Sequence, residues 1–189
     1  MLGFEISKRK FFIDTDTASD DAVALLMALE TPDVEVLGIS IVSGNMPVDQ
    51  GSINARYTVE ICKKNTQVYV GYDKPILKKR EHADWFHGPD GMGNMNYPDP
   101  KIEENKEDYK DVLNSLIQQN PHEITLVTLG PLTNIANFIK KYPEAFQNIK
   151  NIVIMGGAAN TVGNVTPAAE YNIWCDPEAA DIVFQSGHP

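Results

Sequence analysis

Short apolar runs alternate with longer stretches of helical periodicity along most of the chain. The apolar runs, which are rich in β-branched residues, predict strands at 10–14, 34–42, 68–71, 124–128 and 152–155. The periodic stretches predict helices at 20–31, about 47–63, 105–119, 130–141 and 176–185. This alternation is typical of an α/β fold, so we expect a Rossmann-like, open and mainly parallel sheet flanked by helices.

The alternation breaks between residues 72 and 104. This stretch contains several prolines and a glycine-rich segment at 88–93. A loop of this length inside a compact domain is usually functional or mobile. We expect residues 82–97 to form a lid over a binding site.

Polar and glycine residues follow four of the predicted strands where each strand ends. These groups are Asp14/Asp16, Ser43/Asn45, Thr128/Gly130 and Gly156/Gly157. Ligands of open α/β sheets bind beyond the carboxyl ends of the strands, so we expect the four groups to meet in one crevice.

The first of these strand ends carries a cluster of acids. Asp14, Asp16, Asp20 and Asp21 lie within eight residues, and Ser19 is the expected N-cap of the helix that follows. Each close pair of carboxylates costs on the order of 4 kcal/mol at an effective dielectric constant near 20. The cluster therefore predicts a hard divalent cation with oxygen ligands.

Composition narrows the function classes. The chain has 189 residues, 42% of them apolar, and a formal net charge of −10, which predicts one domain over 1–189 and argues against nucleic acid and anionic membranes as partners. No run approaches a membrane span or a signal-peptide core, and the two cysteines match no metal spacing. We expect a cytoplasmic protein.

Two known acidic motifs fit poorly. An EF-hand loop that started at Asp14 would place Ser19 at the glycine position and Leu25 at the final glutamate. The haloacid-dehalogenase-like pattern is closer, because Asp14 and Asp16 follow a strand, but no later acidic pair completes a magnesium site. A metal phosphohydrolase of that class remains an alternative.

The acidic stretch resembles the Asp-x-Asp-x-Gly-x-Asp-Asp motif of the inosine–uridine-preferring nucleoside hydrolases. Further motifs of that family occur in the same order along the chain. They are Ser43-Gly44-Asn45, His87-Gly88 with Gly91, the run 129–134, Met155-Gly156-Gly157, and 163–172 followed by 176–180.

The resemblance implies an enzyme that cleaves the N-glycosidic bond of ribonucleosides to ribose and free base, with a calcium ion, in purine and pyrimidine salvage. By motif, Asp16, Asp21 and the Leu129 carbonyl are the implied calcium ligands, and Asp16 is the implied base that activates the calcium-bound water. Asp14 is implied to support these calcium ligands without binding the ion itself. The implied substrate-binding residues are Asp20, Asn45, His87, Met155, Asn164, Glu170 and Asn172. Glu170 and Asn172 are two apart in a segment predicted to be extended, so we expect both to face the ligand.

Two departures from the family pattern matter. Ala18 replaces the motif glycine, which is harmful if that position requires a positive φ and nearly harmless otherwise. The resemblance also covers only the N-terminal portion of the family domain, so the family's further calcium-ligating Asp and its His near the leaving base are unassigned. An active hydrolase fragment and a calcium- or ribose-binding homologue without turnover both remain open. We expect exposed apolar surface and self-association into a homo-oligomer.

Overall fold

The strands and helices follow one another in the order that the sequence predicts. The structure is a computed structural model that describes residues 8–188; residues 1–7 and 189, which the predicted domain includes, lie outside the described residues. The strands are β1 Arg9–Thr15, β2 Val34–Ile41, β3 Val68–Val70, β4 Ile124–Thr128 and β5 Asn151–Ile154. The helices are α1 Ser19–Glu30, α2 Val48–Ile61, α3 Asp84–His87, α4 Tyr109–Gln119, α5 Thr133–Lys141, α6 Pro143–Phe146, α7 Tyr171–Cys175 and α8 Pro177–Phe184.

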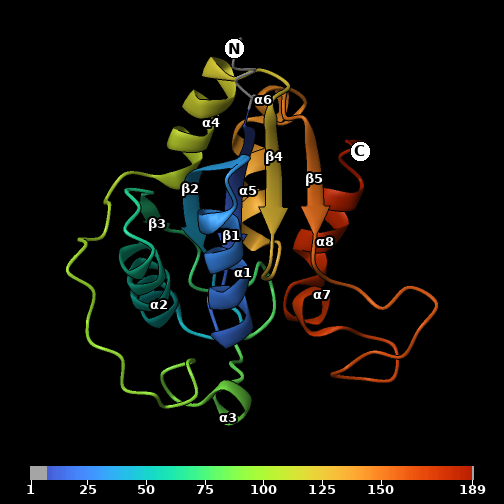
Figure 1. Ribbon diagram of the computed structural model, residues 1–189. Helices are drawn as coiled ribbons and strands as arrows, with labels where there is room; N and C mark the ends of the chain where they lie inside the picture. Colours follow the sequence, from blue (N-terminus) through green and yellow to red (C-terminus); the bar gives the residue numbers. More distant parts are fainter. Residues whose placement is uncertain (1–7, 189) are drawn as a thin grey trace.

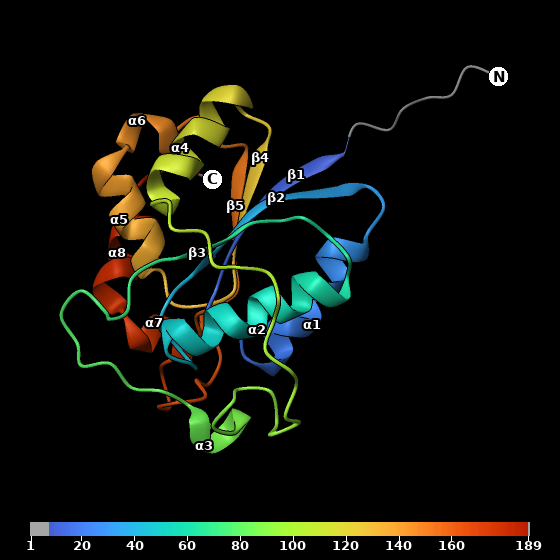
Figure 2. The ribbon, with the colours of Figure 1, turned by 90° about the vertical axis from the view of Figure 1, so that its left-hand side faces the viewer.

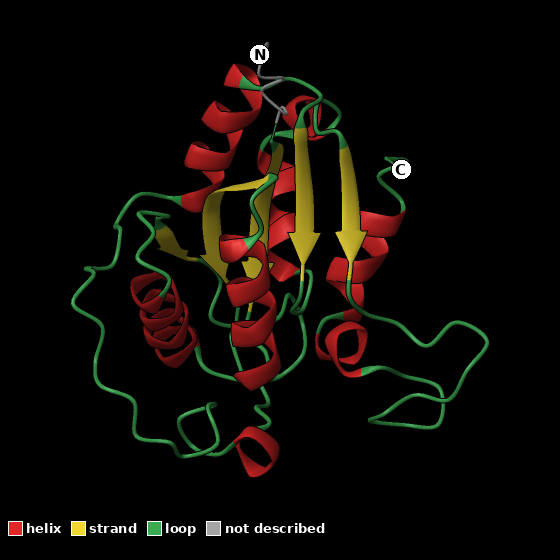
Figure 3. Cartoon of the chain, in the orientation of Figure 1, coloured by secondary structure: helices red, strands yellow, loops and turns green. Residues whose placement is uncertain are grey.

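The five strands form one open sheet in the order β3-β2-β1-β4-β5 (Figures 1 and 3). Every pair of neighbouring strands is parallel. The carboxyl ends of the strands therefore lie along one edge of the sheet, with β1 in the centre. The predicted fold class is confirmed.

Helices cover both faces of the sheet (Figure 2). Phe12 and Ile13 are neighbours on β1 and point to opposite faces, as the two-residue period of a strand requires. Phe12 belongs to a cluster with apolar residues of α4, α5 and α8, and Ile13 to a cluster with residues of α1 and α2. These two layers hold β1, and the acidic loop that follows it, in the middle of the molecule.

The start of α1 differs from the prediction. The N-cap position is Ala18 rather than Ser19, and Ser19 is already the first helical residue. The side chain of Asp21 accepts a hydrogen bond from the Ala18 backbone N–H at 3.0 Å. The Asp21 carboxylate in the first turn thus bonds back to the N-cap backbone, while no N-cap side chain accepts an N–H of the first turn, and the Ser19 hydroxyl is directed elsewhere.

Three short helices were not predicted: α3, α6 and α7. α3 lies within the predicted lid, and α7 occupies part of the segment that was predicted to be extended. Helices of four or five residues give too few turns for an apolar period to appear in the sequence. Within residues 8–188, no helix has the length and apolar character needed to cross a membrane.

Candidate functional site

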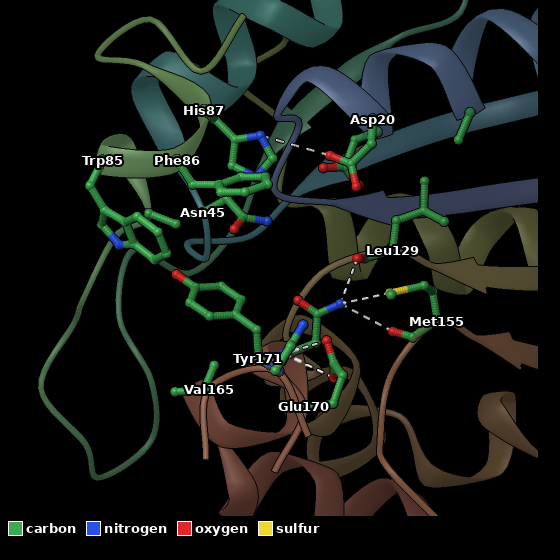
Figure 4. Close-up of a pocket in the computed structure, with 15 residues that line it drawn as sticks. Asp20, Asn45, Trp85, Phe86, His87, Leu129, Met155, Val165, Glu170 and Tyr171 are labelled. Carbon is green, nitrogen blue, oxygen red and sulfur yellow. Dashed lines mark hydrogen bonds and ion pairs between the residues drawn. The ribbon is translucent and has the colours of Figure 1, made fainter. Parts of the chain in front are cut away.

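A cavity of about 380 Å³ opens at the carboxyl ends of the strands (Figure 4). Nine of the eleven predicted site residues line it, together with aromatic side chains of α3 and α7. The nine are Asp20, Asp21, Asn45, His87, Leu129, Met155, Asn164, Glu170 and Asn172. Asn45, Leu129 and Met155, which follow β2, β4 and β5, line this cavity, so these strand ends meet there as expected. Of the residues named for the four strand ends, only Asn45 is part of the lining.

The other two predicted residues, Asp14 and Asp16, form the buried floor beneath the cavity. Both side chains are completely buried, and neither lines the cavity. Oδ1 of Asp14 accepts hydrogen bonds from the Ser40 hydroxyl and, at 2.7 Å, from the Asn134 amide. Oδ2 of Asp16 accepts one from the backbone N–H of Asn45. The floor is thus held by β2, by α5 and by the loop after β2.

Each of these carboxylates keeps one oxygen without a partner. Asp14 Oδ2 and Asp16 Oδ1 are buried and have no hydrogen bond among the described residues, and the same holds for the hydroxyls of Ser43 and Thr128. Buried polar atoms are almost always paired, so these four unpaired atoms need an explanation. A ligand or ion held at the ends of β1, β2 and β4 would provide it.

Burial raises the pKa of both floor carboxyls. The pKa of Asp14 rises to about 7 through desolvation, against the lowering effect of its bonds from Ser40 and Asn134. The pKa of Asp16 also rises to about 7, chiefly through desolvation. Burial, and then repulsion from Asp16, raises the pKa of Asp21. The cluster therefore holds protons near neutral pH unless a positive charge enters it.

Two glycines pack directly on Asp16. A Cβ at Gly44 would overlap Asp16 Oδ2. A Cβ at Gly130 would lie 2.9 Å from Val42 Cγ1 and 3.1 Å from Asp16 Oδ1. The glycines of the motifs at 43–45 and 129–134 are therefore required by space around this carboxylate.

The backbone between Asp16 and Asp21 contains one strained residue, and it is not Ala18. Ala18 has φ −92°, so alanine in place of the motif glycine is harmless there. Thr17 has φ +29°, in the left-handed region, which costs a non-glycine residue on the order of 1–2 kcal/mol. Its N–H donates to Thr15 Oγ1 at 3.0 Å, and its carbonyl accepts from the Asn54 amide at 2.9 Å.

The predicted cation ligands are compatible with a hard ion. Asp16 offers its unpaired Oδ1, while Asp21 and Leu129 line the cavity above it. The Leu129 carbonyl already accepts a bond from the Asn172 amide at 2.8 Å and keeps a second lone pair. Within residues 8–188, no three His, Cys, Asp or Glu side chains are close enough to hold a metal. The oxygen set fits Ca²⁺ or Mg²⁺ in chemistry and would supply part of the coordination that either ion requires.

The predicted extended conformation holds for Glu170, which has φ −84° and ψ 149°, but is wrong for Asn172, which is helical. Glu170 is the N-cap of α7, and its carboxylate accepts the backbone N–H groups of Asn172 at 3.0 Å and Gly157 at 2.9 Å. Asn172 lies in the first turn of α7 and donates to the carbonyls of Leu129 at 2.8 Å and Met155 at 3.1 Å (Figure 4). Both still line the cavity, because the cap draws α7 against the ends of β4 and β5.

α3 forms the opposite rim of the cavity. Trp85 and Phe86 are 81% and 71% exposed, whereas His87 is 9% exposed. Nδ1 of His87 lies 3.0 Å from the Ser19 hydroxyl and 4.0 Å from an Asp20 carboxylate oxygen. His87 therefore joins α3 to the start of α1 while the two aromatic rings stay free at the rim (Figure 4).

The sequence interpretation missed several polar residues that organise the site. Asn134 holds Asp14 and also accepts the Tyr72 N–H at 2.8 Å. Asp176 accepts the Thr133 hydroxyl at 2.6 Å and the Ile76 N–H at 3.0 Å. Asn134 and Asp176 belong to the motifs at 129–134 and 176–180. Their presence in these motifs was the only signal in the sequence, because their main hydrogen-bond partners lie far away along the chain.

Comparison with known proteins gives a consistent result. Residues 11–189 match the family described as inosine-uridine preferring nucleoside hydrolase. The pyrimidine-specific ribonucleoside hydrolase RihB of Escherichia coli O1:K1 / APEC is 42% identical over 188 residues, which are 97% of this chain and 58% of that protein. Uridine nucleosidase 1 of Arabidopsis thaliana is 41% identical over 180 residues, which are 94% of this chain and 54% of that protein.

Solved structures agree with this match. The purine-preferring ribonucleoside hydrolase from Gardnerella vaginalis superposes with a TM-score of 0.91 at 35% identity, covering 95% of this chain and 58% of that one. The chain thus spans a little over half the length of the proteins that it matches.

Proposed function

The chain belongs to the inosine–uridine-preferring nucleoside hydrolase family, and on this premise we propose that it takes part in hydrolysis of the N-glycosidic bond of ribonucleosides. Water adds to C1 of the ribose, the bond from C1 to the base nitrogen breaks, and ribose and free base leave. The observation that carries this proposal is the buried Asp16 beneath a cavity lined by nine of the predicted site residues.

Asp16 is the proposed general base. Its Oδ2 is fixed by the Asn45 N–H, while Oδ1 has no partner among the described residues and is free to accept a proton. Burial raises the pKa of Asp16 in the absence of an ion, so desolvation favours the protonated form that results when this carboxylate takes a proton. Asp14 does not contact the cavity and is proposed to support the floor.

The proposed cation site consists of Asp16, Asp21 and the Leu129 carbonyl, and Ca²⁺ is the proposed ion. When bound, such a cation would lower the pKa of water, so that a neighbouring carboxylate can take its proton. The protein's own contribution is to hold the Asp21 carboxylate and the Leu129 carbonyl at the cavity, with the Asp16 carboxylate buried beneath, where burial strengthens their interaction with positive charge.

The remaining cavity residues are proposed to bind and orient the nucleoside. Asp20 is exposed at the cavity and available to ribose hydroxyls, and Asn45 and Asn164 offer amides close by. Glu170 and Asn172 are largely engaged in holding α7, so we assign them an indirect share in ribose binding. Carboxylates and amide oxygens around the ribose stabilise the positive charge that develops on it when the bond to the base breaks.

Base preference is left open by the relatives, because their names include pyrimidine-specific, uridine-specific and purine-preferring enzymes. We therefore propose a ribonucleoside as substrate without a preferred base. The predicted homo-oligomer and the predicted cytoplasmic location stay predictions.

The test is release of base and reducing sugar from inosine, uridine and cytidine by the purified chain. The chain is assayed with Ca²⁺, with Mg²⁺ and with a chelator. Asp16→Asn is compared with Asp33→Asn, which makes the same charge change at a surface ion pair with Arg9. We expect cation-dependent turnover that only Asp16→Asn abolishes. Turnover that survives Asp16→Asn would overturn the mechanism, and ribose binding without turnover would favour a binding role.

A further inference from the structure

One buried amide joins two loops of the site that are far apart in the sequence. Asn54 lies in the middle of α2 and is 4% exposed. Its Nδ2 donates to the carbonyl of Thr17 at 2.9 Å and to the carbonyl of Asp90 at 3.0 Å. A primary amide has two N–H donors, so each carbonyl receives one of them.

The two carbonyls belong to segments with different tasks. Thr17 lies in the acidic loop between Asp16 and Asp21, and Asp90 lies in the glycine-rich loop that follows α3. α1 and α2 pack side by side, and the chain that carries α3 runs beneath their ends (Figure 2). Asn54 thus lies on α2 and contacts both loops through its side chain.

The acidic loop depends on this contact because it is strained. Thr17 holds φ +29° only while its neighbours fix it, and its carbonyl has the Asn54 amide as its partner. Relaxation of Thr17 would rotate the peptide units on either side of it, and with them the carboxylates of Asp16 and Asp21.

The glycine-rich loop is fitted to the same amide. Gly91 has φ +70°, and a Cβ on it would lie 3.1 Å from Asn54 Nδ2 and 2.7 Å from Met46 Cγ. Asp90 turns the loop by accepting the N–H groups of Met92 at 2.8 Å and Asn94 at 2.9 Å. The loop therefore seats its backbone against Asn54 with no side chain in between.

We propose that Asn54 is a positioning residue that couples the glycine-rich loop after α3 to the acidic loop that carries Asp16 and Asp21. Its third bond, in which Gln50 donates to Asn54 Oδ1 at 2.9 Å, orients the amide so that both N–H groups face the loops. Docking of the loop after α3 against Asn54 and positioning of the Asp16 and Asp21 carboxylates then occur together. Nothing in this coupling requires contact between Asn54 and a substrate.

The first test is amide hydrogen exchange, read by mass spectrometry on the full chain, in peptides that cover residues 14–21 and 88–94. The variants are Asn54→Ala, Asn54→Asp, which keeps the shape but loses both donors, and the control Thr58→Val. Thr58 is equally buried one turn further along α2 and bonds only within the helix. We expect both Asn54 variants to raise exchange in both peptides by about tenfold or more, and Thr58→Val to raise it in neither.

The second test separates coupling from simple loss of structure. Asp90→Ala loosens the glycine-rich loop without touching the acidic loop. We expect it to raise exchange at residues 14–21 in the otherwise unchanged chain, and to add nothing there when Asn54 is already Ala. Additive effects, or protection at 14–21 that Asp90→Ala leaves unchanged, would overturn the proposal.

The kinetic consequence rests on the proposed function: Asn54→Ala should lower kcat and raise KM together, because both loops move. Absence of nucleoside hydrolysis in the unchanged chain would overturn that function, whereas the exchange measurements judge the coupling independently of turnover.

Discussion

The floor and the rim of the cavity are built in opposite ways. The floor consists of Asp14 and Asp16, both completely buried, with glycines packed on one of them and hydrogen bonds from β2, α5 and the loop after β2. The rim consists of α3 and the loop 158–170, where Trp85, Phe86 and Val162 are mostly exposed. The floor tolerates no change in volume or charge, while the rim has space. The contrast suggests that the floor performs the chemistry and the rim selects the ligand.

The largest effect is expected for Asp16→Asn. The amide keeps the shape and accepts the Asn45 N–H, but it cannot take a proton. Loss of a general base lowers rate by roughly 10²–10⁴-fold, so kcat for inosine or uridine should fall by that amount while circular dichroism stays unchanged. Asp33→Asn is the control, and comparable loss in both variants would remove the distinction between floor and surface.

The next effect concerns charge in the floor. In the unfolded chain Asp14 and Asp16 titrate near the usual value, whereas in the folded, cation-free protein the pKa of each is about 7. The folded state therefore binds more protons between these values, and its stability is greatest at low pH and falls as pH rises through 7. Each carboxyl contributes on the order of 4 kcal/mol to this fall.

Thermal melts in chelator at pH 5, 6, 7 and 8 measure that fall. Ca²⁺ should restore the midpoint at pH 8 and matter little at pH 5. Asp14→Asn should flatten the dependence, since it removes one of the carboxyls whose pKa burial raises. A chelated protein whose melting temperature rises from pH 5 to 8 would contradict the buried floor.

A smaller effect is expected for Gly44→Ala, which places a methyl group against Asp16. Overpacking of this kind costs about 1–3 kcal/mol and displaces the carboxylate, so both stability and kcat should fall. Gly156→Ala is the matched variant on the other side of the cavity, where the nearest atom, Glu170 Oε2, lies 3.3 Å from the added carbon. In denaturant melts, the free energy of unfolding of Gly44→Ala should be well below that of Gly156→Ala. Equal values would show that the floor is not the more tightly packed region.

The smallest effect on stability is expected for Trp85→Ala. Because the ring is 81% exposed, the free energy of unfolding should change by less than about 0.5 kcal/mol. KM for a nucleoside should nevertheless rise several-fold, with kcat nearly unchanged, if α3 selects the ligand. Leu77→Ala is the control, since Leu77 is 75% exposed and does not line the cavity. A lower kcat with an unchanged KM would assign the rim a part in the chemistry.

The fold was predictable because it depends on local patterns. Each of the five strands is an apolar run of ordinary length, and the strand 124–128 was predicted to the residue. The convergence of site residues was also predictable, because carboxyl ends of parallel strands must share an edge. The sequence could not show whether Ala18 is tolerated in place of the motif glycine, because this depends on its φ angle, which is −92° in the structure.

What the sequence could not supply is long-range pairing. Nothing local marks Asn54 as the partner of Thr17, 37 residues away, or Asn134 as the partner of Asp14, 120 residues away. The capping role of Glu170 went unpredicted for a related reason, because its carboxylate also accepts the backbone N–H of Gly157, 13 residues away. Such partners are chosen by the packing of the whole sheet.

The central position of β1 has a consequence for protein synthesis. The acidic loop is made more than a hundred residues before Gly130 and Asn134, the partners that complete its surroundings. A nascent chain on the ribosome therefore cannot close this site until β4 has docked against β1, a contact of high sequence separation that forms slowly. Protection of the emerging chain by a cation should accordingly appear late and abruptly, once α5 has left the exit tunnel.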